Sequence, residues 1–272
     1  MIRLSVRVRR ADAELVLAEL LTLAPSGVEE REEDDSVEYA VYGAPGELPD
    51  LPDLRAAAGD ALVEVRTEEV ADDWDERWKQ FHQPIEVGGR LHVRPPWSPP
   101  PGRDGLDVVI DPAQAFGTGA HATTRLCLEL MLELEPGGAF ADIGCGSGVL
   151  AIAAAKLGWG PVAAVDFDPL SVEATRANAA VNGVVVDARV GDLRREEMPG
   201  APTVAANLLR PLLLAYAERL AGPEPRRLIA SGLLREEADE VAAAFAPHGL
   251  AERARRESGE WAALLLERRV VN

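Results

Sequence analysis

The sequence has few cysteines and no long apolar run. Only Cys127 and Cys145 occur among 272 residues, and they form no CxxC pair, so we expect neither a disulfide framework nor a structural zinc site. No apolar run approaches the roughly 20 residues that a transmembrane helix needs. The first residues, MIRLSVRVRR, alternate like a strand, whereas a signal peptide contains an uninterrupted apolar region. These absences predict a soluble, cytoplasmic protein.

Basic residues are in the minority. The 28 lysines and arginines stand against 46 aspartates and glutamates, which gives a formal net charge of -18. Nucleic-acid binding requires a basic patch, so we expect no direct contact with nucleic acid. The acidity would suit a lysine-rich protein substrate, but it is equally typical of a surface that only keeps a protein soluble. The sequence contains no sustained heptad pattern, which would indicate an obligate oligomer, so we expect a monomer.

The chain contains enough apolar residues, 47%, for a substantial core and is long enough for two domains. Residues 1–67 follow the order strand, helix, strand, strand, weak helix, strand, which is typical of a small ferredoxin-like α+β domain. From residue 104 to 272, strand-like runs alternate with helical patterns. That alternation predicts an α/β domain with a mostly parallel sheet.

A linker is predicted between the two domains, at residues 68–103. It places Trp74, Trp78 and Phe81 on one face of a short helix, and we expect these rings to anchor the linker and not to bind a ligand. The five prolines of RLHVRPPWSPPPGR then make long regular structure improbable.

Seven strands are expected in the second domain. The last two are joined near Ser258 and Gly259 and are predicted to form an antiparallel hairpin at one edge of the sheet. The expected strands are 140–144, 161–166, 184–190, 202–207, 226–231, 250–257 and 260–268.

The segment DIGCGSG, Asp142 to Gly148, is the most informative motif. It lies between a short buried strand and an apolar helix that ends at Gly158, so strand, glycine loop and helix follow in order. Such a loop approaches a ligand closely, and the helix N-terminus presents unpaired N–H groups to it. Asp166 ends the next strand, where a carboxylate accepts hydrogen bonds from ribose hydroxyls. The motif predicts a nucleotide-type cofactor.

The glycine spacing distinguishes two cofactor classes. Gly144, Gly146 and Gly148 form GxGxG, whereas the dinucleotide fingerprint is GxGxxG. Asp142 would repel a pyrophosphate but suits a ligand with an ammonium and a sulfonium. The pattern therefore favours S-adenosylmethionine over NAD, and Gly144, Gly146 and Asp166 are predicted to bind it.

Further candidates follow from their positions in the predicted elements. Thr124, at the end of the loop 111–124, either caps the following helix or places its hydroxyl on a ligand. Asp192 follows the third strand and either contacts the adenine amino group or is a turn acid. Asn207 ends the fourth strand, at the edge where open α/β sheets bind ligands, but a loop-capping role is equally compatible.

No metal site is expected. His121 has no partner at metal-ligand spacing and is interpreted as a structural loop residue. Cys145 is interpreted as a small loop residue and not as a nucleophile.

Taken together, several motifs resemble the PrmA family, which methylates ribosomal large-subunit protein eleven. They are FGTGAHATT, DIGCGSGVLAIAAAKLG, AVDFDPLSVEATRANAAVNG, AANLL, SGLL, EWAALLLER and the linker DWDERWKQFHQPIEVGGRLHVRPPW. The resemblance covers essentially the whole chain. It implies a class I methyltransferase domain with a seven-stranded sheet, preceded by a ferredoxin-like domain that recognises the substrate.

The resemblance also implies site residues and a reaction. Thr124, Gly144, Asp166 and Asn207 match the family's cofactor-contacting positions, with Gly146 and Asp192 as further contacts. The family trimethylates lysine side chains and the N-terminal amine of its substrate. Asn207 and neighbouring backbone carbonyls are expected to orient the amine, and no general base is assigned.

The chain departs from the family pattern at a few positions, and three other functions stay open. Ala120 and Ala122 replace threonine and proline, and DFDP stands where DIDP is frequent. Enzymes that methylate release-factor glutamine or adenine carry NPPY-type motifs, whereas this chain has NLLRP. A small-molecule methyltransferase would not need the front domain. The third alternative is a non-enzymatic ribosome-assembly module that retains the cofactor fold.

Overall fold

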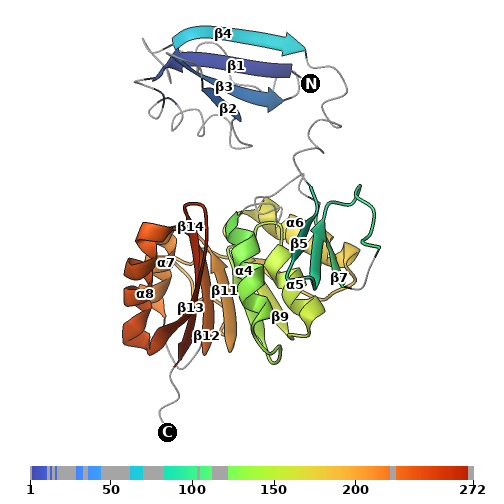
Figure 1. Cartoon of the computed structure of the whole chain (residues 1–272), viewed down its shortest axis with the longest axis vertical. Coiled ribbons are helices and arrows are strands. Elements are labelled where there is room, and N and C mark those ends of the chain that lie inside the picture. The colour runs from blue at the N-terminus through green and yellow to red at the C-terminus, as the bar shows by residue number, and fades with distance from the viewer. Residues whose placement is uncertain are drawn as a thin grey trace. The chain divides into compact units, whose positions relative to one another are not determined.

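The computed structural model divides the chain into two compact units, Met1–Phe81 and His82–Asn272, which Figure 1 colours from blue to red along the sequence. The structure describes residues 2–10, 13, 16, 29–32, 36–43, 62–69, 83–102, 105–111, 122–220 and 225–268. The predicted aromatic helix at Trp74, Trp78 and Phe81 lies outside these residues, and so do the loop residues 112–121, which include His121.

The first unit contains a four-stranded antiparallel sheet in the order β2-β3-β1-β4. Its strands are β1 (Ile2–Arg9), β2 (Glu29–Glu32), β3 (Ser36–Gly43) and β4 (Leu62–Glu69). This strand order is the one expected of a ferredoxin-like domain, and the weak helix predicted before β4 and most of the helix predicted after β1 lie outside the described residues. Leu4, Val6 and Val8 alternate along β1 and pack on one face with Val37 and Tyr39, as the two-residue period of a strand requires.

The opposite positions of this sheet carry charges that pair across strands. Glu38 of β3 forms ion pairs with Arg3 (2.5 Å) and Arg7 (3.5 Å) of β1. On the other side of β1, Arg7 also pairs with Glu64 of β4, at 3.6 Å. Cross-strand pairs of this kind support the register of the sheet.

The second unit contains a sheet of seven strands, as predicted, and their order is β10-β9-β8-β11-β12-β14-β13. The strands are β8 (Phe140–Ile143), β9 (Val162–Asp166), β10 (Asp187–Val190), β11 (Thr203–Asn207), β12 (Arg227–Leu234), β13 (Leu250–Ser258) and β14 (Trp261–Arg268). The first five are parallel to one another, and β14 runs antiparallel to both β12 and β13. The expected C-terminal hairpin therefore lies at one edge.

Helices cover both faces of this sheet (Figure 1). One core forms between the sheet and α4, α5 and α6, and a second core forms on the other side with α7 and α8. The helices are α4 (Ala122–Leu132), α5 (Val149–Leu157), α6 (Pro169–Val181), α7 (Arg210–Arg219) and α8 (Ala238–Phe245), with short 3-10 turns at Arg235–Glu237 and Ala246–His248. In the described part of the chain, no helix is both long and apolar enough to span a membrane.

Part of the predicted linker is regular structure of the second unit. A three-stranded sheet is formed by β5 (Ile85–Val87), β6 (Leu91–Arg94) and β7 (Leu106–Val109). Apolar residues of all three strands are buried in the core shared with α4 and α5. Arg94 forms two hydrogen bonds with Asp107, at 2.8 and 2.7 Å, which link β6 to β7 across the proline-rich segment. Proline excludes long elements, but strands of three or four residues fit between prolines.

Candidate functional site

The glycine loop joins β8 to α5 and lies against the end of β9. Gly144 has φ 77°, and its N–H donates to the Val165 carbonyl at 2.8 Å. Cys145 donates to the same carbonyl at 3.1 Å. Gly146 and Gly148 also have positive φ, at 52° and 82°. The backbone therefore turns sharply at the carboxyl edge of the sheet, where parallel α/β sheets bind their ligands.

Asp166 is held against the same loop. Its Oδ2 accepts the Gly146 N–H at 2.9 Å, and its Oδ1 accepts the Asp168 N–H at 3.0 Å. A carboxylate oxygen has two acceptor positions, so each oxygen keeps one for a further donor. The structure thus brings together two of the predicted cofactor residues, and it orients the carboxylate before any ligand binds.

Asp142 begins the loop and is fully buried at the end of β8. Its Oδ2 accepts the Ala151 N–H at 3.0 Å and so satisfies a donor in the first turn of α5. Among the described residues, its Oδ1 has no hydrogen-bond partner. Burial raises the pKa of this carboxyl to about 7, with a smaller contribution from the charge of Asp166. A positively charged ligand near the loop would favour its ionised form.

Asn207 and Thr124 meet on the other side of the loop. Asn207 ends β11, and its Nδ2 donates to the Thr124 Oγ1 at 3.4 Å. Thr124 is buried within the first turn of α4, which begins at Ala122, so a plain N-cap role for Thr124 does not fit. Gly144 lies so close to Leu208 that a Cβ atom on Gly144 would be 2.2 Å from the Leu208 Cδ2. Contacts therefore run continuously from Asp166 through the glycine loop to Asn207 and Thr124.

Comparison with known proteins identifies the family. The model of the family "Ribosomal protein L11 methyltransferase (PrmA)" matches residues 49–269. The chain belongs to this family. The ribosomal protein L11 methyltransferase of Pelotomaculum thermopropionicum is 42% identical over 207 residues, which are 74% of this chain and 67% of that protein. That of Pseudomonas aeruginosa is 41% identical over 204 residues, 73% of this chain and 69% of that protein.

A solved structure agrees with this membership. The crystal structure of a ribosomal protein L11 methylase from Lactobacillus delbrueckii subsp. bulgaricus is 28% identical to this chain, with a TM-score of 0.62. The match covers 70% of this chain and 100% of that chain. The chain is a methyltransferase, and its second unit has the class I methyltransferase fold.

Asp192 differs from the other predicted site residues. It follows β10, as expected, but its carboxylate is engaged by Arg194 through contacts of 3.0 and 3.2 Å. Arg195 lies 3.6 Å away. The hydrogen bond from Arg194 is the main cause that lowers the pKa of Asp192. An adenine amino group would have to share this carboxylate with Arg194, and the adenine contact stays a prediction.

Two residues of α6 hold the glycine loop, and the sequence reasoning missed both. The Thr175 Oγ1 donates to the Gly146 carbonyl at 2.9 Å, and the Asn178 Nδ2 donates to the Ser147 carbonyl at 2.9 Å. Both side chains are buried. Together with Ser171, they form a polar row at spacings of four and three residues on an otherwise apolar helix face. That row was the available signal, because buried polar groups need partners.

Phe167 is a second feature that the motif did not reveal. It directly follows Asp166 and its side chain is 70% exposed, although it is a large apolar residue. Leu170, three residues later in α6, is 57% exposed. Exposed apolar side chains beside a predicted ribose-binding acid suit the flat face of a nucleobase.

The cysteines do not offer a nucleophile. Both are buried, and burial raises the pKa of each thiol, that of Cys127 to about 12. Reactive cysteines need a thiolate, which these environments disfavour.

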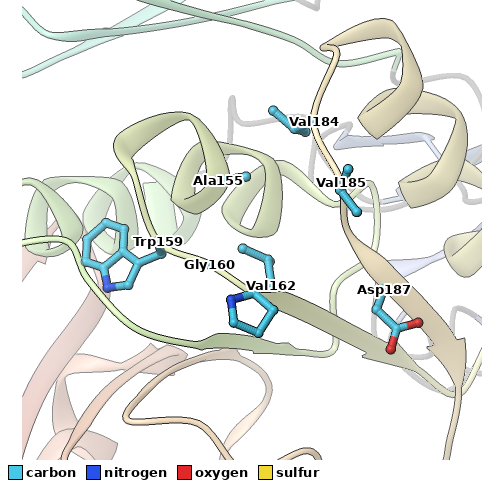
Figure 2. A pocket seen from close by; sticks show the side chains of 8 residues that line it. Ala155, Trp159, Gly160, Val162, Val184, Val185 and Asp187 are labelled. Carbon is cyan, nitrogen blue, oxygen red and sulfur yellow. The ribbon is translucent and has the colours of Figure 1, made fainter.

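A groove elsewhere on the second unit is unrelated to this site. Figure 2 shows it between the C-terminal part of α5 and the segment that leads into β10, with Val184, Val185 and Trp159 around it. Its volume is about 420 Å³, and its lining is almost entirely apolar except for Asp187. The groove lies at the amino ends of β9 and β10, the edge opposite to the one used for ligands in parallel sheets.

Proposed function

We propose that this chain transfers methyl groups from S-adenosylmethionine to amino groups of ribosomal protein L11, namely lysine side chains and the N-terminal amine. The observation that carries the proposal is the continuous set of contacts from Asp166 through Gly146 and Gly144 to the segment after Asn207. This continuity supports a donor site at the glycine loop and an acceptor site beside it at Asn207. Family membership supplies the class of reaction.

The residues present fit S-adenosylmethionine. Gly144 and Gly146 would pass close to its amino-acid end, and Asp166 would bind its ribose through the acceptor positions that the loop leaves open. The buried Asp142 Oδ1 has no partner, which suits a ligand that brings positive charge into the loop. When bound, this cofactor supplies a methyl group on a cationic sulfur.

The acceptor amine must be neutral and aligned before it reacts. A lysine amine has an unperturbed pKa of about 10.4, and burial beside a positive charge would lower it. Asn207 would orient the amine: its Nδ2 points to Thr124, which leaves its side-chain oxygen and the neighbouring backbone carbonyls as acceptors. The proton would leave to solvent, because we assign no general base.

The charge of the first unit supports a basic protein as substrate. Acidic residues outnumber basic ones by more than two to one in residues 1–81, but only by a small margin in the rest of the chain. Within that unit, the charges of β1 and β3 already pair with one another, as Glu38 does with Arg3. The excess of acidic residues in residues 1–81 therefore lies outside these ion pairs. We propose that this front domain, predicted as residues 1–67, recognises the substrate, and that the enzyme acts as a cytoplasmic monomer without contacting nucleic acid.

Mass spectrometry of reaction products tests the proposal. Purified protein and labelled S-adenosylmethionine are incubated with a ribosomal protein extract, and the labelled bands are identified. The label is expected on L11, at lysines and the N-terminal amine, and Asn207→Ala is the negative control. Label on other proteins but not on L11 would refute the substrate, and the absence of any S-adenosylmethionine binding in calorimetry would refute the reaction.

A further inference from the structure

Strand β12 is irregular beside the segment that follows Asn207. Its pairing with β14 shifts register between Ser231 and Leu233. The residue between them, Gly232, has φ 84°, a conformation that residues with a Cβ atom rarely adopt. Gly232 is thus a bulge residue in the strand adjacent to β11, at the level where β11 ends.

Gly232 lies directly against the backbone of Leu208. A Cβ atom on Gly232 would be 2.6 Å from the Leu208 carbonyl oxygen, 2.8 Å from its carbonyl carbon and 3.0 Å from its nitrogen. The Leu208 N–H also donates to the Ser231 carbonyl at 2.9 Å. No side chain fits at position 232 unless the Leu208 backbone moves.

The side chain of Leu208 is held from the opposite direction. Its Cδ2 lies where a Cβ atom on Gly144 would be only 2.2 Å away. Leu208 therefore lies between two glycines, with its backbone against Gly232 of β12 and its side chain against Gly144 of the glycine loop.

A further contact connects this packing to the helix that carries Thr124. The buried Ser231 Oγ lies 3.4 Å from the Thr123 carbonyl and 3.0 Å from the Ala262 carbonyl. The bulge, the end of β11 and the start of α4 are thus fixed to one another.

We propose that Gly232 is a positioning residue for methyl transfer: it sets the place of the Asn207–Leu208 segment relative to the glycine loop, and Leu208 transmits this spacing to Gly144. The inference rests on the proposed function, because it assumes that this segment receives the acceptor amine. Gly232 itself touches neither reactant. Its role is to admit the Leu208 backbone at a distance that any other residue would forbid.

Gly232→Ala tests the proposal, with Gly259→Ala as the matched control. Gly259 also has a positive φ, 58°, but no atom of the described residues lies within 4 Å of a Cβ atom added there. The control therefore has the conformational strain of alanine at positive φ without the steric clash. We expect Gly232→Ala to lower kcat at saturating cofactor at least about tenfold, since misplacement by about 1 Å costs up to about 100-fold. Its Kd for S-adenosylhomocysteine should rise by a smaller factor than kcat falls, since Asp166, Thr175 and Asn178 still hold the glycine loop when Leu208 moves. Gly259→Ala should keep wild-type kcat.

A second pair of variants separates the two contacts of Leu208. Gly144→Ala should weaken S-adenosylhomocysteine binding, and adding Leu208→Ala should restore part of the loss because the clashing Cδ2 is removed. Leu208→Ala should not rescue Gly232→Ala, because that clash is with backbone atoms.

Three outcomes would overturn the positioning role. They are wild-type kcat in Gly232→Ala, equal losses in Gly232→Ala and Gly259→Ala, and a crystal structure of Gly232→Ala in which Leu208 has not moved. The proposed function fails separately, if the wild-type protein does not methylate L11. The crystal structure and the binding rescue would still decide the packing inference in that case.

Discussion

Around the glycine loop, side chains of α6 hold the backbone through hydrogen bonds of 2.9 Å, donated by Thr175 and Asn178. At Asn207, by contrast, the hydrogen bond between side chains is a longer one, 3.4 Å to Thr124, and Leu208 packs closely between two glycines. The proposed donor half, the glycine loop with Asp142 and Asp166, is thus held by polar contacts, and the proposed acceptor half, the Asn207–Leu208 segment, mainly by steric ones. Changes on the acceptor half should therefore affect turnover more than cofactor binding, and changes on the donor half should do the reverse.

The largest effect is expected at Asn207. Asn207→Ala removes the group that orients the amine, and kcat for L11 methylation should fall about 100-fold. Thr124→Val removes only the hydroxyl that fixes the Asn207 amide, so a loss of about tenfold is expected. Single-turnover methylation and calorimetry with S-adenosylhomocysteine measure the two halves separately. Wild-type turnover in Asn207→Ala would remove its proposed role.

On the donor half, Asp166→Asn should mainly weaken cofactor binding. The substitution removes the charge and replaces one acceptor oxygen by an NH2 group, so the Gly146 and Asp168 N–H groups both lose a charged acceptor and one of them faces a donor. The Kd for S-adenosylhomocysteine should rise about 10- to 100-fold, in line with hydrogen bonds to charged groups. Its kcat at saturating cofactor should change less than in Asn207→Ala. An unchanged Kd would contradict the assignment of Asp166 to the ribose.

Asp142 gives the donor half a dependence on pH. Its pKa is raised from 3.8 to about 7, so the neutral form is favoured in the folded protein and stability is lost as the pH rises from about 4 to about 7. The side chain of Asp142→Asn stays neutral, so across this pH range the variant should lose a few kcal/mol less of its unfolding free energy than wild type. Urea unfolding of both proteins without cofactor, at pH values across this window, measures the difference. Parallel curves would show that the raised pKa is wrong.

The smallest effect is expected at Asp192. Because Arg194 already engages its carboxylate, Asp192→Ala should change the Kd for S-adenosylhomocysteine by less than about threefold. Asp192→Asn provides the matched variant that keeps the shape. A tenfold loss in both variants would instead support the adenine contact and place Asp192 in the donor half.

Much of the fold was predictable because the strands are short apolar runs bounded by turn residues. The strands of the seven-stranded sheet and its edge hairpin were all expected at nearly the observed residues. β10 begins at Asp187, later than predicted, since the apolar residues before it do not pair with β9. The strands β5, β6 and β7 were missed, because three or four residues between prolines carry too little periodicity to be recognised.

The candidate site was predictable on its donor half for a similar reason. The loop and Asp142 belong to one strand, turn and helix, and Asp166 ends the strand that follows this helix, so their order along the chain was enough to predict that they meet. Thr175 and Asn178 act on this loop from 29 and 31 residues away, and only the packing of α6 shows which face they occupy. Their spacing in the sequence indicates a row of buried polar side chains, but it does not indicate which groups these side chains contact.

Local patterns in the sequence were enough to predict the class of fold, the glycine loop and its acidic residue, because the periodicity of apolar residues and the spacing of glycines can be recognised within a few residues. The acceptor half needed the folded chain. Gly144, Leu208 and Gly232 are far apart in the sequence and meet only because β8, β11 and β12 are adjacent in the sheet. The closeness of their contacts depends on strand order and on one bulge, and neither is encoded in any one of the three segments.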